Sequence, residues 1–323
     1  MGDLAALAPF AARAALGWAA TARQALATGP VALVTVLATE GSAPLGAGAR
    51  MVVGQQGLLA GSVGGGALEW RALEQARAIL AHAPGTWRVQ DYPLGPLLGQ
   101  CCGGRVRLLV ERLDPALAGW LAEALPGEAL EAHYTPTAVR RHVVPAHKAP
   151  PGMADARSAK PEAGAVLGEM LGALPRPVLL FGAGHVGQAL ERALAPLPFA
   201  LHWFDTRPEF ARPGVAIAGE DTLIAAITQA APEAALLILT HDHGLDYRLA
   251  SAALARPQGA PLFTGVIGSA TKAARFRSRL GAQGLAAARL TCPIGLAGIG
   301  GKAPAVIAAS VAAQLLMLES APC

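Results

Sequence analysis

The chain has 323 residues, of which 53% are hydrophobic and only 15% are charged, and this composition excludes an intrinsically disordered protein. Its formal net charge of +4 comes from scattered Lys and Arg residues, which argues against nucleic-acid binding and favours a small anionic ligand. No run of about 18 apolar residues predicts a membrane-spanning helix, and the first residues lack the pattern of a signal peptide. We therefore expect a cytoplasmic protein of roughly two domains that binds neither a membrane nor nucleic acid.

Prolines concentrate in one stretch near the middle of the chain. Proline lacks an amide donor and has a fixed φ, so such a stretch interrupts both helices and sheets. The sequence thus predicts an amino-terminal domain over residues 1–143, a proline-rich linker over 144–176 and a carboxy-terminal domain over 177–323. Within the linker we expect a short helix over residues 165–174.

The apolar spacing in the first domain predicts an α/β fold. In chain order, we expect a helix over 3–28, strands over 31–38, 50–53 and 58–60, a helix over 67–82, and strands over 87–91 and 105–111.

After the linker, strands and helices alternate. In chain order, we expect strand 178–181, helix 185–195, strand 199–205, helix 221–230, strand 234–240, a helix that begins at 243 or 245 and ends near 255, strand 261–267 and helices 269–280 and 303–318. Strands separated by helices of about ten residues or more are typical of a Rossmann-like, doubly wound parallel sheet.

A glycine-rich turn follows the first strand of this second domain. Gly182 permits a tight turn, Gly184 lets a phosphate group approach the backbone, and Gly187 lets the next helix pack on the strand. His185 lies within the same motif. Asp205 ends the following strand, where a carboxylate can accept hydrogen bonds from ribose hydroxyls. This pattern predicts a phosphate-binding turn.

The occupant of this turn stays open on sequence grounds. NAD(P), another phosphorylated ligand or no ligand are all compatible with the pattern, because the same scaffold serves many functions. Arg207 lies close to the acidic position and favours a 2′-phosphate or another anion there.

Three further polar residues of the second domain are candidate ligand contacts. His243 follows a strand at the end where such sheets bind ligands, although the neighbouring Asp242 can also simply cap the next helix. Ser269 opens a basic helix, which suits a phosphate as well as a solvated surface. Lys302 belongs to a second glycine-rich segment. Ala303 follows this lysine, so the segment does not match a nucleotide-binding P-loop.

Two adjacent cysteines form the most unusual segment of the first domain. Cys101 and Cys102 follow Gln100 and precede two glycines, which leave the backbone accessible. No Cys-x-x-Cys pair occurs, which argues against a structural zinc site. The two thiols are therefore candidate ligands of a soft metal or carriers of sulfur, and buried inert cysteines are the alternative.

Other charged residues of the first domain give no reaction by themselves. Glu40 and Arg50 lie in apolar surroundings, as a buried pair or as ligand contacts, and the sequence leaves both interpretations open. Neither Gly-x-Ser-x-Gly nor His-Glu-x-x-His occurs, which argues against a self-contained hydrolase.

These motifs occur together and in order, and together they resemble the XdhC/CoxI family, in particular its XdhC members, the accessory chaperones of xanthine dehydrogenase. The two segments most specific to the resemblance are Gln100–Gly104 and Cys292–Leu296. The other matching segments are 38–44, 46–51, 61–69, 180–187, 241–243 and 267–269.

The resemblance implies a function that composition does not. A protein of this kind binds the molybdenum cofactor, Mo-molybdopterin, as cargo while a cysteine desulfurase installs a sulfido ligand. It then delivers the cofactor to the molybdenum subunit of xanthine dehydrogenase, and it is not itself a turnover enzyme. Cys101 and Cys102 match the thiol loop of the family. We also expect a homodimer.

One departure from the family pattern matters for the thiols. Some members have a cysteine after the triple glycine, where this chain has Ala67, so a thiol role falls on Cys101 and Cys102, with Cys292 as the less favoured alternative. Two other functions stay open: an NAD(P)-dependent oxidoreductase with His243 as its acid or base, and a dinucleotide-sensing module.

Overall fold

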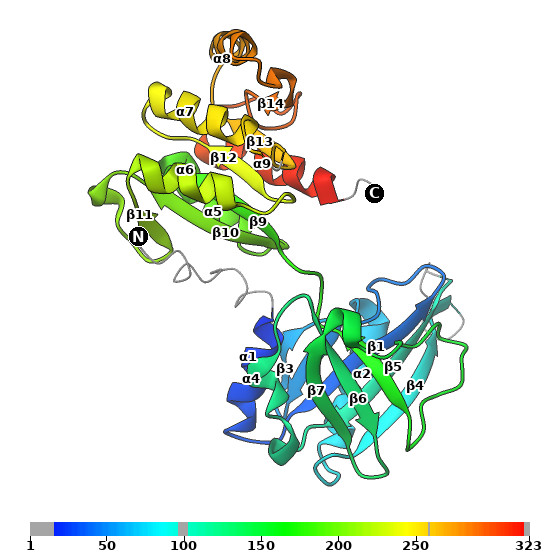
Figure 1. The fold of residues 1–323 in the computed structure, drawn as a ribbon. Coiled ribbons are helices and arrows are strands. Elements are labelled where there is room, and N and C mark those ends of the chain that lie inside the picture. The colour runs from blue at the N-terminus through cyan, green and yellow to red at the C-terminus, as the bar shows by residue number, and fades with distance from the viewer. Residues whose placement is uncertain (1–15, 96–102, 258, 320–323) are drawn as a thin grey trace. The chain divides into compact units, whose positions relative to one another are not determined.

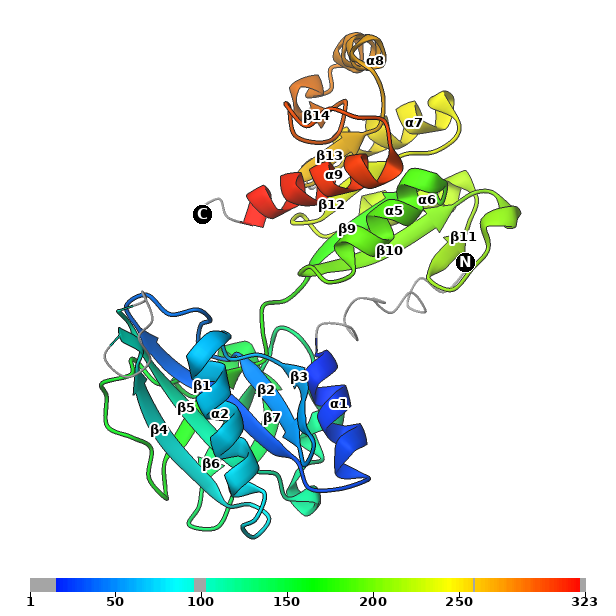
Figure 2. The ribbon, with the colours of Figure 1, turned by 180° about the vertical axis from the view of Figure 1, so that it is seen from behind.

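The computed structural model describes residues 16–95, 103–257 and 259–319. Its described residues form two compact units, an amino-terminal unit that ends at Leu174 and a Rossmann unit that begins at Pro175. Figures 1 and 2 show the elements of each unit from opposite sides.

A five-stranded antiparallel sheet is the centre of the amino-terminal unit. Its order is β3-β2-β1-β5-β4. The strands are β1 (Ala32–Glu40), β2 (Arg50–Gly54), β3 (Gly57–Gly61), β4 (Trp87–Pro93) and β5 (Arg105–Arg112). The central strand β1 is buried from Ala32 to Ala38, because both faces of the sheet are covered. A continuous apolar run is typical of such a strand.

Different elements cover the two faces of this sheet (Figures 1 and 2). Helix α2 (Gly66–Ile79) packs Leu68 and Ala72 against Val34 on one face. On the other face, Leu33 packs with helices α1 (Gly17–Leu26) and α4 (Trp120–Glu123). A second, three-stranded antiparallel sheet lies on this same face, in the order β7-β6-β8. Its strands are β6 (Glu128–Tyr134), β7 (Val139–Pro145) and β8 (Val166–Met170).

The prediction of an interdomain linker over residues 144–176 is wrong for nearly all of these residues. The prediction of a short helix over 165–174 is wrong as well. Residues 166–170 form strand β8, which pairs with β6, and the amino-terminal unit extends to Leu174. Arg107 fixes the proline-rich segment before β8 by donating hydrogen bonds to the carbonyl oxygens of Ala156, Ser158 and Ala159 at 2.7–3.2 Å. Prolines remove amide donors but keep carbonyl acceptors, so a side-chain donor can order the segment.

A buried network of four charged residues joins the two sheets. Arg50 Nη2 lies 2.8 Å from Glu169 Oε2, and Arg141 Nη2 lies 3.0 Å from Glu169 Oε1 and 2.7 Å from Glu111 Oε1. Each of these side chains is at most 3% exposed. Burial would raise the pKa of Glu169, but Arg141 and Arg50 outweigh burial and hold the pKa below its usual value. Arg50 thus forms a buried pair with Glu169 and not with Glu40, the partner considered from the sequence.

The Rossmann unit is a six-stranded parallel sheet in the order β11-β10-β9-β12-β13-β14. Its strands are β9 (Arg176–Phe181), β10 (Phe199–Asp205), β11 (Val215–Ile217), β12 (Ala235–Ile238), β13 (Phe263–Val266) and β14 (Leu290–Thr291). Its helices are α5 (His185–Leu194), α6 (Glu220–Gln229), α7 (His243–Leu254), α8 (Ala270–Ala282) and α9 (Pro304–Glu319). The predicted doubly wound fold is confirmed.

Two helices cover one face of this sheet and three cover the other. Helices α5 and α9 pack on one side, and α6, α7 and α8 pack on the opposite side (Figures 1 and 2). The strand order reverses between β9 and β12, which is the position where ligands bind in open sheets of this kind. Among the helices of the described residues, none has the length and apolar character needed to cross a membrane.

Replacing Glu169 by Ala tests the buried network. Two buried arginines would then lack one of their carboxylates, so the free energy of unfolding of the amino-terminal unit should fall by about 3–5 kcal/mol. Urea unfolding followed by tryptophan fluorescence measures this, because Trp18, Trp70, Trp87 and Trp120 all lie in this unit. The control Glu74→Ala removes the exposed partner of Arg71 and should cost about 0–1 kcal/mol. Equal losses in the two variants would contradict a structural role for the network.

Candidate functional site

The glycine-rich turn after β9 needs glycine at two of its three positions and has open space at the third. Gly182 has φ +125°, and a Cβ there would lie 2.3 Å from the Leu239 carbonyl oxygen. A Cβ on Gly187 would lie 2.1 Å from the Gly182 carbonyl oxygen. A Cβ on Gly184 would meet no heavy atom within 4 Å, and no side chain caps helix α5. The start of α5 is therefore uncapped and has open space beside Gly184, which suits an anion such as phosphate.

Asp205 ends β10 and is hydrogen-bonded on both carboxylate oxygens. Its Oδ2 accepts from the Ala183 amide at 2.6 Å and from Arg207 Nη2 at 2.9 Å. Its Oδ1 accepts from the Arg207 amide at 2.9 Å and from Arg207 Nε at 3.0 Å. Burial would raise the pKa of Asp205, but the donors on Arg207 and Ala183 outweigh burial and hold the pKa below its usual value. The sequence predicted the position of this carboxylate but not that Arg207 would bond to it.

The polar residues after β12 have three different environments: Asp242 caps a helix, His243 is exposed and Asp246 is buried. Asp242 accepts a hydrogen bond from the Gly244 amide at 2.6 Å and caps α7, as the second interpretation of this motif predicted. His243, by contrast, is 84% exposed. Asp246 is the second aspartate of this segment. It is buried, accepts from the Thr240 hydroxyl at 2.7 Å and pairs with Lys272 at 2.5 Å.

The other candidate contacts of the Rossmann unit are exposed. His185 begins α5 beside Gly184, and Ser269 accepts from the Lys272 amide at 3.3 Å as the cap of α8. Lys302 lies just before α9, whose first helical residue is Pro304. The structure thus places His185 at the first residue of a helix, and Ser269 and Lys302 on the segments that precede helices.

The segment Cys292–Leu296 has a structural role that the sequence did not reveal. The Gln314 side-chain amide bonds both the amide and the carbonyl of Gly295, at 2.9 and 3.3 Å, and the Leu296 amide donates to Ser310 Oγ at 2.8 Å. Gly295 has φ +100°, and a Cβ there would lie 2.7 Å from Ser310 Oγ. Helix α9 therefore holds this loop, while burial raises the pKa of the Cys292 thiol.

The cysteine pair and Gln100 lie outside the described residues, but the stems of their loop are described. The Leu94 amide donates to the Gly104 carbonyl at 2.9 Å. A Cβ on Gly104 would lie 2.2 Å from the Ser42 carbonyl oxygen, and one on Gly64 would lie 2.6 Å from Pro44 Cβ. The loop after β1, the glycine loop before α2 and the exit of the cysteine loop therefore meet at one end of the sheet.

The glycine loop before α2 differs from the turn of the Rossmann unit. The Glu69 carboxylate accepts from the Ser62 hydroxyl and from the amides of Val63 and Gly65, at 3.4 and 3.3 Å for the two amides. The chain's own carboxylate therefore occupies the place that an external anion would take. This contrast separates the two glycine-rich loops, which look alike in the sequence.

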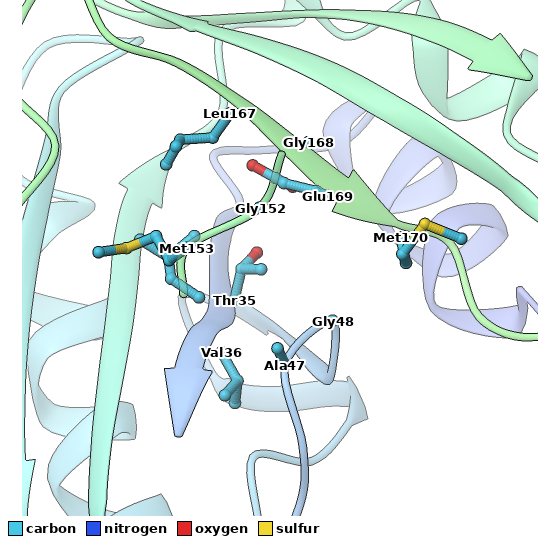
Figure 3. A pocket seen from close by; sticks show the side chains of 11 residues that line it. Thr35, Val36, Ala47, Gly48, Gly152, Met153, Leu167, Gly168, Glu169 and Met170 are labelled. Carbon is cyan, nitrogen blue, oxygen red and sulfur yellow. The ribbon is translucent and has the colours of Figure 1, made fainter. Parts of the chain in front are cut away.

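A cavity of about 140 Å³ lies in the amino-terminal unit, between β1, β8 and the loop before β2 (Figure 3). The Thr35 hydroxyl and the Glu169 side chain both point into it. Thr35 is 1% exposed and its hydroxyl has no hydrogen-bond partner. Met153 and Met170 contribute to the apolar wall. None of the predicted site residues lines this cavity.

No metal centre is visible in the part of the chain that the structure describes. There, no three or more His, Cys, Asp or Glu side chains are grouped so that they could hold a metal ion. The cysteine pair falls outside that part, so its predicted role as a metal ligand stays a prediction.

Comparison with known proteins gives matches over both units. A family model described as the XdhC Rossmann domain matches residues 178–315, and one described as the XdhC and CoxI family matches residues 20–92. A crystal structure described as a xanthine dehydrogenase from Bacillus halodurans has a TM-score of 0.69 at 19% identity, covering 94% of this chain and 95% of that chain. At this identity the likeness concerns the fold. No curated protein matches the sequence significantly.

Two glycine variants separate the structural and the ligand-facing parts of the turn. Gly182→Ala combines a strained backbone with a collision and should lower the free energy of unfolding of the Rossmann unit by about 2–4 kcal/mol. Gly184→Ala meets open space and should cost about 0.5 kcal/mol. Thermal unfolding of both variants measures the difference. If Gly184→Ala were the more destabilising, the assignment of open space to Gly184 would be wrong.

Proposed function

The chain belongs to the XdhC and CoxI family, and from this premise we propose that it is an accessory protein in the maturation of a xanthine dehydrogenase. It binds Mo-molybdopterin as cargo and holds it while a cysteine desulfurase supplies sulfur. It then passes the cofactor to the molybdenum subunit of the dehydrogenase. Family membership over both units is the observation that carries this proposal.

The chemistry of the cargo fits the features of the two units. Molybdopterin ends in a phosphate monoester, and we assign this phosphate to the open turn at Gly184, where backbone amides can donate to it. Thiolates are ligands for soft metal centres, and we assign the molybdenum to Cys101 and Cys102. The expected homodimer stays a prediction.

The oxidoreductase alternative receives less support. It would use His243 as an acid or base, and such a histidine is normally oriented by a hydrogen bond to a second group. Its Nδ1 lies 4.0 Å from Asp246 Oδ2, beyond hydrogen-bond range, and the carboxylate is already engaged by Lys272 and Thr240.

Retention of the cofactor tests the proposal. The purified chain is incubated without oxygen with Mo-molybdopterin and desalted, and molybdenum and pterin are then measured per chain. We expect near-stoichiometric retention. The double variant Cys101→Ala/Cys102→Ala and the variant Gly184→Val should each weaken retention by about tenfold or more, which corresponds to about 1.4 kcal/mol.

Two controls sharpen this test. Cys323→Ala removes a thiol outside the cysteine loop and should retain the cofactor as the unaltered chain does. Parallel samples receive NAD or NADP in place of the cofactor. Failure of the unaltered chain to retain molybdenum, together with micromolar dinucleotide binding, would overturn the proposal. Unchanged retention in the double cysteine variant would remove the thiols from the site.

A further inference from the structure

The position that recognises ribose in a dinucleotide-binding unit is filled here by the chain itself. In such units the carboxylate at the end of the second strand accepts hydrogen bonds from the ribose hydroxyls. Asp205 stands at that position, at the end of β10. A carboxylate offers about four lone-pair sites, and Ala183 and Arg207 together make four hydrogen bonds to Asp205. No acceptor site is left for a ribose diol.

The contact between Arg207 and Asp205 is built to persist. The guanidinium binds both carboxylate oxygens through two N–H groups, the geometry in which arginine pairs most strongly with a carboxylate. The guanidinium also lies 3.9 Å from the centre of the Phe210 ring, which holds its other face. The Asp205 side chain is 2% exposed. A ribose would therefore have to displace a charged partner from a buried carboxylate, which is costly.

The uncapped start of α5 takes no part in the contact between Arg207 and Asp205. Arg207 and Asp205 act at the end of β10, whereas the amides at the start of α5 remain uncapped and Gly184 faces open space. The unit thus keeps the part of a Rossmann site that binds phosphate and closes the part that binds the adenosine ribose.

We propose that Arg207 is a specificity-determining residue that makes the Rossmann unit reject dinucleotides and accept a ligand that ends at its phosphate. In naming a phosphate monoester as the ligand class, the inference rests on the proposed function. The exclusion of the ribose rests only on the contacts of Asp205.

Titration with NADH, followed by its fluorescence, tests this inference on the whole chain. The unaltered chain should bind NADH no more tightly than about 1 mM, or about −4 kcal/mol. Arg207→Ala frees the carboxylate and should bind NADH about tenfold more tightly. NADPH should gain nothing, because Asp205 would then repel its 2′-phosphate.

Two further variants keep the result interpretable. Arg207→Lys keeps a positive charge beside the buried carboxylate but cannot bind it through two N–H groups, so it should fold even if Arg207→Ala does not, and it should show a smaller gain. Arg212→Ala is the matched control, since Arg212 lies over the Trp203 ring and takes no part in the hydrogen bonds to Asp205. It should bind NADH as the unaltered chain does.

The outcomes separate this inference from the proposed function. Micromolar NADH binding by the unaltered chain would overturn the inference, and so would unchanged binding in both Arg207 variants. Micromolar NADPH binding that Arg207→Ala abolishes would also overturn it, because Arg207 would then recognise a 2′-phosphate. A gain in NADH binding by Arg207→Ala without cofactor retention by the unaltered chain would support the inference while the proposed function failed.

Discussion

The hydrogen bonds to the buried carboxylate of Asp205 determine the structure of the Rossmann unit around the glycine turn and the end of β10. Its negative charge needs hydrogen-bond donors, because an unpaired buried charge is costly. The Ala183 amide supplies one donor and thereby fixes the glycine turn, while Arg207 supplies the others and closes the ribose position. One side chain thus connects the shape of the glycine turn to the proposed exclusion of a ribose at the end of β10.

The amino-terminal unit depends on a different buried charge network. Arg50, Glu111, Arg141 and Glu169 connect the five-stranded sheet to the three-stranded one. The end of the larger sheet carries the loops around the cysteine pair, and there Glu69 already satisfies amides of the glycine loop. This contrast with the open turn at Gly184 supports assigning an anion to the Rossmann unit and not to the glycine loop before α2.

The sequence predicted the features that depend on local spacing and missed those that depend on distant partners. The Rossmann sheet and its turn follow from alternating apolar segments and three glycines, so they were predicted. Strand β8 was hidden, because prolines surround it and its pairing with β6 is not local. Arg50 and Glu169 are 119 residues apart, and no local pattern joins them. The glycine loops before α2 and α5 look alike in the sequence, and they differ in the structure because Glu69 accepts hydrogen bonds from amides of the first loop.

The most direct test of the proposed function is transfer of the cofactor. The chain is loaded with Mo-molybdopterin, freed of unbound cofactor and mixed with xanthine dehydrogenase that lacks molybdenum. Molybdenum in the separated proteins and dehydrogenase activity are then followed together. The account predicts that molybdenum leaves the chain and that activity rises in proportion. Retention of molybdenum by the loaded chain, or activation no better than that by free cofactor, would contradict it.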